Sequence, residues 1–273
     1  MDLIFFDLDG TLLNDASEIS AFTKDTLSLL RDKNIAYTVA TGRTMLSAQP
    51  IMHGHDFDLP QIYSNGVTVW NPKTQELALE NLLSNVEISK VVDTAVAHRI
   101  TPFVHAIDRS HQHFIFHTET HHDVEQALVH GYFSKSKAKL LPLAELPINS
   151  RVTNISMIGD NDVIHEMWLA LNDHANLVAY SGPAMEGAKF SWMDIHHNQA
   201  SKGSAVIELK KRLGASNVIC FGDSNNDLSM FKLADESYAP NNAKDEIKQF
   251  ANEVIGHNHN DGVAHFLRER FSL

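Results

Sequence analysis

The most constraining feature of the sequence is an apolar run that ends in two closely spaced carboxylates. Leu3-Ile4-Phe5-Phe6 is followed directly by Asp7-Leu8-Asp9-Gly10-Thr11. A short continuous apolar run bounded by an Asp-Gly turn signal is typical of a buried strand in a parallel sheet. In open α/β sheets, ligands bind beyond the carboxyl ends of the strands. Asp7 and Asp9 are therefore predicted to lie at a ligand site, although Asp-Gly alone also fits an ordinary turn.

Two neighbouring carboxylates need a compensating charge. Two unit charges about 4 Å apart repel by roughly 4 kcal/mol at an effective dielectric near 20. Mg²⁺ prefers oxygen ligands and keeps water molecules that a phosphate oxygen can replace. The pair therefore favours a magnesium ion and a phosphate ester as substrate.

A second polar segment, Thr41-Gly42-Arg43, follows the strand-like residues Ile35–Ala40. The N-terminus of the helix expected after it is suited to bind an anion. An ordinary helix cap at Thr41 is the alternative. Arg43 is open to either substrate contact or an ion pair, and Pro50 predicts that the helix is short.

A third segment contains Lys202, which opens a predicted helix with Val206, Leu209 and Leu213 on its apolar face. A lysine in the first turn opposes the helix dipole and is tolerated more easily beside an anion. A solvated surface lysine is the alternative.

The fourth segment follows another apolar run, Val218-Ile219-Cys220-Phe221. It reads Gly222-Asp223-Ser224-Asn225-Asn226-Asp227, which is acidic and rich in amides. The pattern of a buried strand followed by carboxylates thus occurs twice. The single cysteine, Cys220, is expected to be a small core residue within its strand.

In this order, the four segments resemble the motifs of the haloacid dehalogenase-like (HAD) superfamily, specifically the Cof-type phosphatase branch with an α/β (type IIB) cap. Asn65-Gly66 and Asp261-Gly262-Val263-Ala264 are similar to further segments of that branch. The resemblance covers nearly the whole chain. It implies a Rossmann-like parallel-sheet core with an inserted, smaller α/β cap domain. The chain departs from the branch at Ala239-Pro240-Asn241-Asn242-Ala243, where a glycine usually precedes Asn-Ala, and an Asn is expected to take up the left-handed backbone there.

The resemblance also implies roles for individual residues. The catalytic set is Asp7 as the nucleophile that forms an aspartyl-phosphate, Asp9 as general acid and base, and Lys202 as the neutralising charge. The phosphate-binding groups are the amides of Leu8 and Gly42 and the side chains of Thr41, Lys202 and Asn226. Mg²⁺ is expected on the carboxylates of Asp7 and Asp223 and the carbonyl of Asp9. Asp227 is not expected to bind the metal directly. It is expected to orient Lys202 or the water molecules bound to the metal.

Alternating strand and helix patterns predict parallel βαβ units and two domains. Residues 1–82 and 190–273 are expected to form the catalytic core, and residues 83–189 the cap, which is expected to set substrate specificity. Four extended runs in the cap begin at Phe103, His113, Asn154 and Leu177, and helical apolar faces are centred on Val91 and Met167.

The amino-acid composition limits the kinds of partner that the protein is expected to bind. Lysine and arginine number 22 against 34 aspartate and glutamate, a net charge of −12 that argues against a nucleic-acid partner. The lack of a signal peptide or an apolar run of about 18 residues predicts a cytoplasmic protein that does not interact with a membrane.

Histidines 111, 113, 117, 121 and 122 cluster in the cap, where a solvated strand face is expected rather than a transition-metal site. The oligomeric state stays open.

Together these observations predict a Mg²⁺-dependent phosphatase. It is expected to hydrolyse a small phosphorylated metabolite, such as a sugar phosphate, a nucleotide or a phosphorylated cofactor, through an aspartyl-phosphate. A phosphotransferase or mutase using the same intermediate is one alternative, and a non-catalytic regulatory protein that binds phosphate and metal is another.

Overall fold

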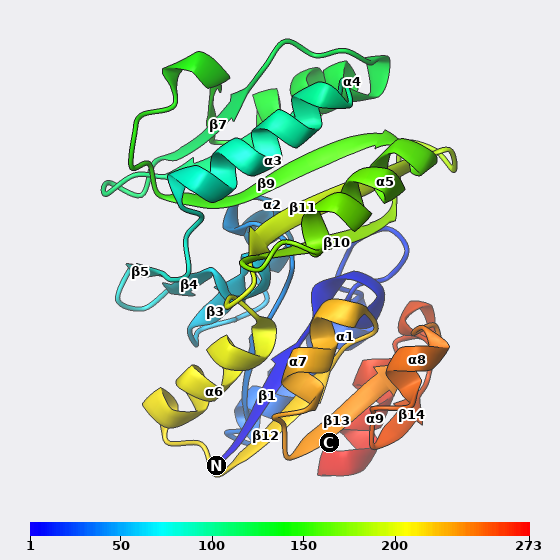
Figure 1. The fold of residues 1–273 in the computed structure, drawn as a ribbon. Helices are drawn as coiled ribbons and strands as arrows, with labels where there is room; N and C mark the ends of the chain where they lie inside the picture. Colours follow the sequence, from blue (N-terminus) through cyan, green and yellow to red (C-terminus); the bar gives the residue numbers. More distant parts are fainter. The chain divides into compact units, whose positions relative to one another are not determined.

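The computed structural model describes residues 1–273, which divide into two compact units (Figure 1). Unit 1 comprises Met1–Ala78 and Ala200–Leu273, and unit 2 comprises Leu79–Gln199. Unit 2 is therefore an insertion into unit 1, and both are α/β structures. This is the predicted fold class, a Rossmann-like parallel-sheet core with an inserted α/β domain.

The core of unit 1 is a five-stranded parallel sheet in the order β14-β13-β12-β1-β2. Its strands are β1 (Asp2–Phe6), β2 (Ala36–Val39), β12 (Asn217–Phe221), β13 (Glu236–Pro240) and β14 (Glu253–Ile255). The apolar run of β1 is fully buried because side chains from both faces of the sheet enter packed cores. Cys220 is buried in β12, as predicted.

Helices connect and cover these strands. They are α1 (Ala21–Asp32), α2 (Met45–Met52), α6 (Lys202–Leu213), α7 (Leu228–Phe231), α8 (Asp245–Lys248) and α9 (Gly262–Phe271). As predicted, α2 is short, and Pro50 lies in its last turn. A small sheet of β3 (Gln61–Tyr63), β4 (Thr68–Asn71) and β5 (Glu76–Leu79) completes the unit.

The Asp261-Gly262 segment joins α9 to α1. Asp261 has a left-handed backbone with φ of 54°, and its Oδ1 accepts hydrogen bonds from the hydroxyls of Ser20 (2.6 Å) and Thr23 (3.0 Å). A Cβ atom at Gly262 would lie only 1.9 Å from the carbonyl oxygen of Gly256. This motif therefore has a packing explanation in unit 1.

The Pro240–Ala243 loop folds differently from the expectation. The amide of Ala243 donates to the carbonyl of Pro240 (2.8 Å), and neither Asn241 nor Asn242 has a positive φ. Asn242 instead donates from Nδ2 to the carbonyl of Gly10 (2.7 Å). The expected left-handed turn was wrong, because a side-chain hydrogen bond to the Asp9-Gly10 turn holds this loop.

Unit 2 contains a six-stranded sheet in the order β10-β11-β9-β6-β7-β8. Its strands are β6 (Phe103–Ile107), β7 (His113–His117), β8 (Lys139–Pro142), β9 (Val152–Asp160), β10 (Leu177–Pro183) and β11 (Phe190–His197). Its helices are α3 (Asn85–Ala97), α4 (Asp123–Gly131) and α5 (Asn161–Asn172). The predicted helix faces bury Val91 on α3 and Met167 on α5.

The unit boundaries differ from the expected residues 83 and 189. Strand β11 pairs antiparallel with both β9 and β10, so Phe190–His197 belongs to the insertion rather than to the core. Its buried Met193 and Ile195 alternate with Asp194, which is the period of a strand with one apolar face. The strand was not evident in the sequence because its other face is polar. None of the helices combines the length and apolar character that crossing a bilayer demands.

Candidate active site

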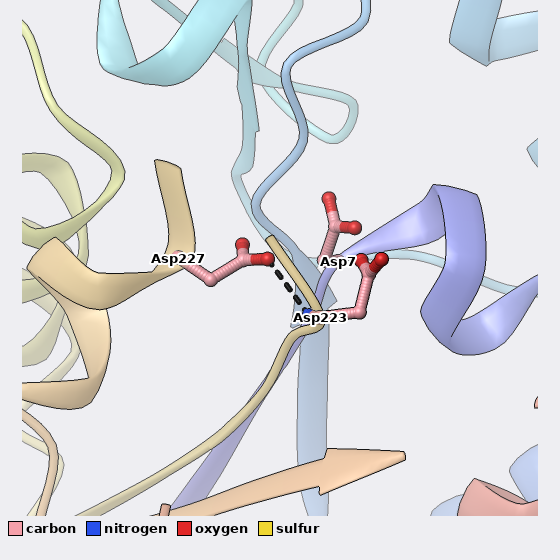
Figure 2. Close-up of side chains that lie close together, drawn as sticks. All are labelled: Asp7, Asp223 and Asp227. Carbon is pink, nitrogen blue, oxygen red and sulfur yellow. Dashed lines mark hydrogen bonds between the residues drawn. The ribbon is translucent and has the colours of Figure 1, made fainter. Parts of the chain in front are cut away.

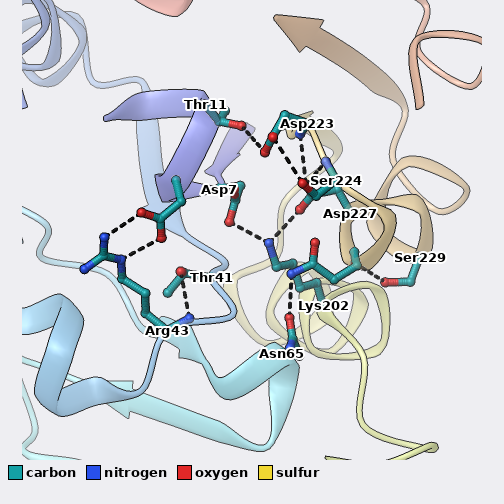
Figure 3. A network of polar contacts seen from close by, with 12 residues as sticks. Asp7, Thr11, Thr41, Arg43, Asn65, Lys202, Asp223, Ser224, Asp227 and Ser229 are labelled. Atoms are coloured by element: carbon teal, nitrogen blue, oxygen red, sulfur yellow. Dashed lines mark hydrogen bonds and ion pairs between the residues drawn. The ribbon is translucent and has the colours of Figure 1, made fainter. Parts of the chain in front are cut away.

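Polar residues follow three adjacent strands at one edge of the parallel sheet. In β1, Phe6 is aligned with Phe221 of β12 on one side and with Val39 of β2 on the other. Asp7 follows β1 at once, and the predicted second and fourth motifs follow the other two strands. The carboxyl ends of parallel strands meet at the same edge, so motifs far apart in the sequence form one site (Figure 3).

Asp7, Asp223 and Asp227 form an acidic cluster (Figure 2). Each offers a carboxylate oxygen, and these oxygens lie within 4.8 Å of one another. The close approach depends on Gly10, which has φ of 71° and where a Cβ atom would lie 2.5 Å from Asp223 Oδ2. Thr11 also holds Asp223 in place, because its hydroxyl donates to Oδ1 at 3.2 Å.

Lys202 is fully buried in this cluster. Its Nζ donates to Asp7 Oδ1 and to Asp227 Oδ1, both at 2.6 Å. These two carboxylates explain why a lysine is stable in the first turn of α6, and the alternative of a solvated surface lysine was wrong. The following Gly203 lets α6 approach closely, since a Cβ atom there would lie 2.2 Å from the carbonyl oxygen of Ser229.

Both oxygens of Asp227 accept hydrogen bonds. Oδ1 accepts from Lys202, and Oδ2 accepts from the amides of Asp223 and Ser224, each at 2.9 Å. Asp227 therefore fixes the lysine and the loop that carries Asp223 at the same time.

Burial and mutual repulsion dominate the electrostatics of the cluster. Burial raises the pKa of Asp7 well above its ordinary value, against the lowering effect of Lys202. Burial and the charge of Asp227 raise the pKa of Asp223 to about 6. For Lys202, burial lowers the pKa, but the carboxylates of Asp227 and Asp7 raise it more, so the net pKa lies above the ordinary value of a lysine.

The donor set fits a divalent cation. Three carboxyl groups lie beside a single ammonium, so acidic groups outnumber basic ones in this largely buried cluster. Carboxylate oxygens are the ligands that Mg²⁺ prefers. Asp7 and Asp223 were predicted as ligands, whereas Asp227 is already engaged by Lys202 and two amides. The predicted carbonyl of Asp9 belongs to the turn Leu8–Leu12 that follows Asp7.

The predicted phosphate-binding residues lie on the loops around the acidic cluster. Leu8 follows Asp7 directly, and the hydroxyl of Thr41 accepts a hydrogen bond from the amide of Arg43 (3.1 Å). Gly42 lies against Asn226, because a Cβ atom there would be 3.2 Å from Asn226 Nδ2. The same Nδ2 donates to Asn65 Oδ1 at 2.9 Å.

Arg43 resolves an alternative that the sequence left open. Its guanidinium forms a bidentate ion pair with the carboxylate of Asp9. The Asp9 side chain is about half exposed and is not part of the buried acidic cluster. The predicted general acid is thus held by an arginine of the second motif.

Thr11, Asn65 and Asn242 contact site residues, although the sequence alone did not assign them a role. Asn65-Gly66 was noticed as a motif, and Asn242 only as part of an irregular one. Two of the five clustered histidines of unit 2 contact backbone carbonyls: His117 Nδ1 lies 2.7 Å from the carbonyl of Thr118, and His122 Nε2 lies 3.1 Å from that of Arg99.

Comparison with known proteins agrees with this geometry. The family model of haloacid dehalogenase-like hydrolases matches residues 4–267. The 5-amino-6-(5-phospho-D-ribitylamino)uracil phosphatase YitU of Bacillus subtilis is 26% identical over 99% of this chain and 98% of its own. The pyridoxal phosphate phosphatase YbhA of Escherichia coli is 24% identical over 97% of each chain.

Solved structures share the fold of the whole chain. A haloacid dehalogenase-like hydrolase from B. subtilis has a TM-score of 0.81 at 22% identity, covering 98% of this chain and 99% of the other. The HAD subclass IIB sugar phosphatase BT4131 has a TM-score of 0.77 at 17% identity, covering 100% and 99%. With the family match spanning nearly the entire sequence, the chain belongs to the haloacid dehalogenase-like hydrolases, in the Cof-type branch with an inserted α/β domain.

Proposed function

We propose that the protein is a Mg²⁺-dependent phosphatase that hydrolyses a small phosphorylated metabolite through an aspartyl-phosphate. The observation that carries this proposal is the buried contact between Asp7 and Lys202, beside Asp223 and Asp227. A nucleophilic carboxylate must approach an anionic phosphoryl group, and repulsion between them opposes the reaction. A buried ammonium bonded to that carboxylate reduces the repulsion.

In the first step, an oxygen of Asp7 attacks phosphorus. A bond from Asp7 to phosphorus forms, the ester bond breaks, and the leaving alcohol takes a proton from an Asp9 oxygen that has left its pair with Arg43. In the second step, Asp9 removes a proton from water as the water attacks phosphorus, which breaks the bond to Asp7 and releases phosphate. Asp9 thereby returns to its protonated form.

The loops around Asp7 supply the groups that hold the phosphoryl oxygens. These are the amides of Leu8 and Gly42, the hydroxyl of Thr41, the Nδ2 of Asn226 and the ammonium of Lys202. The carboxylates of Asp7 and Asp223 and the carbonyl of Asp9 would hold Mg²⁺. The bound ion supplies positive charge that neutralises the phosphoryl group, which positioning catalysis of this kind requires.

The relatives support small phosphorylated metabolites as the substrate class. Their names specify a phosphorylated ribitylaminouracil and pyridoxal phosphate, which share a phosphate ester on a compact organic body. We propose that the substrate is a sugar phosphate, a nucleotide or a phosphorylated cofactor. We also propose that residues of the inserted unit 2 select among these substrates.

Phosphate release tests the proposal. The purified protein is assayed with p-nitrophenyl phosphate and a panel of phosphorylated metabolites, with Mg²⁺ and with EDTA. Release of one phosphate for each substrate consumed, lost with EDTA, is the expected result. Transfer of the phosphoryl group to another metabolite without free phosphate would indicate a transferase or mutase. Phosphate binding without turnover of any ester would indicate a regulatory protein.

A further inference from the structure

We propose that Asn65 is a positioning residue that fixes the side-chain amide of Asn226 with its Nδ2 toward the phosphoryl group. This inference rests on the proposed function, because it assigns Asn226 to the substrate phosphate. Asn65 is buried, and its Oδ1 accepts from Asn226 Nδ2 at 2.9 Å (Figure 3). The contact joins two residues that are 161 positions apart in the chain.

The backbone around Asn65 is held in an unusual conformation. Ser64, Asn65 and Gly66 have φ angles of 46°, 52° and 99°, so three consecutive residues lie in the left-handed region. Non-glycine residues in this region cost free energy and cluster at functional sites. An asparagine tolerates it better than most residues, which fits its presence here.

The segment Ser64-Asn65-Gly66 also contacts two other segments of the site. The amide of Asn65 donates to the carbonyl of Thr41 (3.1 Å), and the amide of Ser64 donates to that of Arg43 (2.9 Å). On the other side, a Cβ atom at Gly66 would lie 2.3 Å from the carbonyl oxygen of Ser201, the residue before Lys202. Asn65 therefore has a fixed place relative to both loops.

The contact between the two asparagines lies close to Gly42, which belongs to the proposed phosphate-binding loop. A Cβ atom at Gly42 would lie 3.2 Å from Asn226 Nδ2 and 3.3 Å from Asn65 Oδ1. The pair of amides thus lies directly against the Gly42 backbone, whose amide is proposed to hold a phosphoryl oxygen.

The chemistry of the amide gives the contact its purpose. Nδ2 of Asn226 carries two protons, one of which binds Asn65 and the other of which remains for a phosphoryl oxygen. The Oδ1 of Asn226 is buried and has no hydrogen-bond partner, so that oxygen does not fix the orientation. Without Asn65, the amide can rotate and present Oδ1 to the phosphoryl oxygens, which repels them.

A double-mutant cycle tests this role with p-nitrophenyl phosphate and Mg²⁺. Asn65→Gly removes the side chain but allows the left-handed backbone, and Asn226→Ala removes the group that it positions. We expect Asn65→Gly to lower kcat/KM about tenfold and to weaken inhibition by inorganic phosphate by a similar factor, as the loss of one hydrogen bond to an anion predicts. Adding Asn65→Gly to Asn226→Ala should then cause no further loss.

A spectroscopic readout separates positioning from folding. The side-chain amide NMR signals of Asn226 are assigned as the pair missing from Asn226→Ala. They should move in Asn65→Gly and stay near their wild-type positions in Asn65→Asp, which keeps an acceptor oxygen and also tolerates the left-handed backbone.

Three results would overturn the role of Asn65 in an active wild type. These are unchanged kcat/KM in Asn65→Gly, multiplication of the two single losses in the double variant, and unmoved Asn226 amide signals in Asn65→Gly. A folded wild type that releases no phosphate from any ester would instead overturn the proposed function, and the role of Asn65 with it.

Discussion

Arg43 holds the carboxylate of Asp9 with two hydrogen bonds, from Nε to Oδ2 at 2.6 Å and from Nη2 to Oδ1 at 2.5 Å. Both oxygens of the proposed general acid are therefore fixed by one planar guanidinium. A bidentate pair of this kind sets orientation as well as charge. The second motif thus holds the proposed proton-transfer residue of the first, and one Asp9 oxygen must leave Arg43 before it can exchange a proton with the leaving alcohol.

Arg43→Lys tests this orienting effect, because lysine keeps the charge but not the fork of donors. We expect kcat to fall about tenfold for an alkyl phosphate, whose leaving group needs a proton, and much less for p-nitrophenyl phosphate. Equal losses on both substrates would contradict the account and place Arg43 on the phosphoryl group. Arg31→Lys, in an exposed pair with Asp56, is the matched control and should change neither rate.

Metal binding should stabilise unit 1. Asp223 lies in a buried acidic cluster, so its ionisation in the metal-free protein is unfavourable. We expect Mg²⁺ to raise Tm in the wild type. Asp223→Asn should raise the metal-free Tm by about 2–4 °C, as roughly 1 kcal/mol predicts, and should abolish the Mg²⁺ effect.

Differential scanning calorimetry with and without Mg²⁺ measures both effects. Asp93→Asn, at an exposed position on α3, is the control and should retain the full Mg²⁺ response. A wild-type response that persists in Asp223→Asn would remove Asp223 from the metal site.

The packing of α6 against Ser229 should be intolerant of a single methyl group. In Gly203→Ala, the new Cβ meets backbone atoms rather than a flexible side chain. We expect a loss of about 1–3 kcal/mol of stability and a drop in kcat, since Lys202 is the preceding residue. Urea unfolding and phosphate release measure the two effects.

Gly131→Ala is the matched control, because Gly131 ends α4 and has no atom within 4 Å of an added Cβ. It should unfold at the same urea concentration as the wild type or a slightly higher one, with unchanged kcat. If Gly203→Ala behaved like this control, the close packing would be irrelevant to the site.

Unit 2 should lose stability in mild acid. Burial lowers the pKa of His105 to about 4, although the nearby Asp194 acts in the opposite direction. The unfolded chain binds a proton at His105 below about pH 6.5, whereas the folded chain binds it only near pH 4. The stability contributed by the neutral side chain is therefore complete above pH 6.5 and is lost as the pH falls from 6.5 to 4.

We expect the wild type to lose about 2 kcal/mol from this group between pH 7.5 and pH 5. His105→Gln, which can keep the hydrogen bond to Ser156 (2.8 Å), should show a smaller loss. Urea unfolding at the two pH values, followed by tryptophan fluorescence, measures the difference. The same pH dependence in both proteins would exclude His105 as the titrating group.

The sequence predicted the parts of the site that depend on topology. Asp7 and Asp223 each follow an apolar run, and parallel strands bring such positions to one edge. Lys202 was a candidate because a lysine at a helix start is tolerated more easily beside an anion, but the sequence left a solvated surface position as an equal alternative. The limits of the insertion were less accurate, since β11 alternates apolar and polar residues and its pairing with β9 is visible only in the fold.

Side-chain contacts between distant segments could not be predicted. The Arg43–Asp9 pair and the Asn65–Asn226 contact depend on where two loops pass each other, to within an ångström. Asn242 shows the same limit: the sequence suggested a backbone conformation, whereas a hydrogen bond to Gly10 holds the loop.

The most direct test of the central claim is the identity of the phosphorylated residue. The wild type and Asp7→Asn are mixed with a phosphate ester and Mg²⁺, quenched in acid, and digested for peptide mass spectrometry. We predict a phosphoryl group on Asp7 in the wild type, and neither a phosphoryl group nor turnover in a folded Asp7→Asn. Full turnover in that variant, or a phosphoryl group on another residue of the wild type, would contradict Asp7 as the nucleophile.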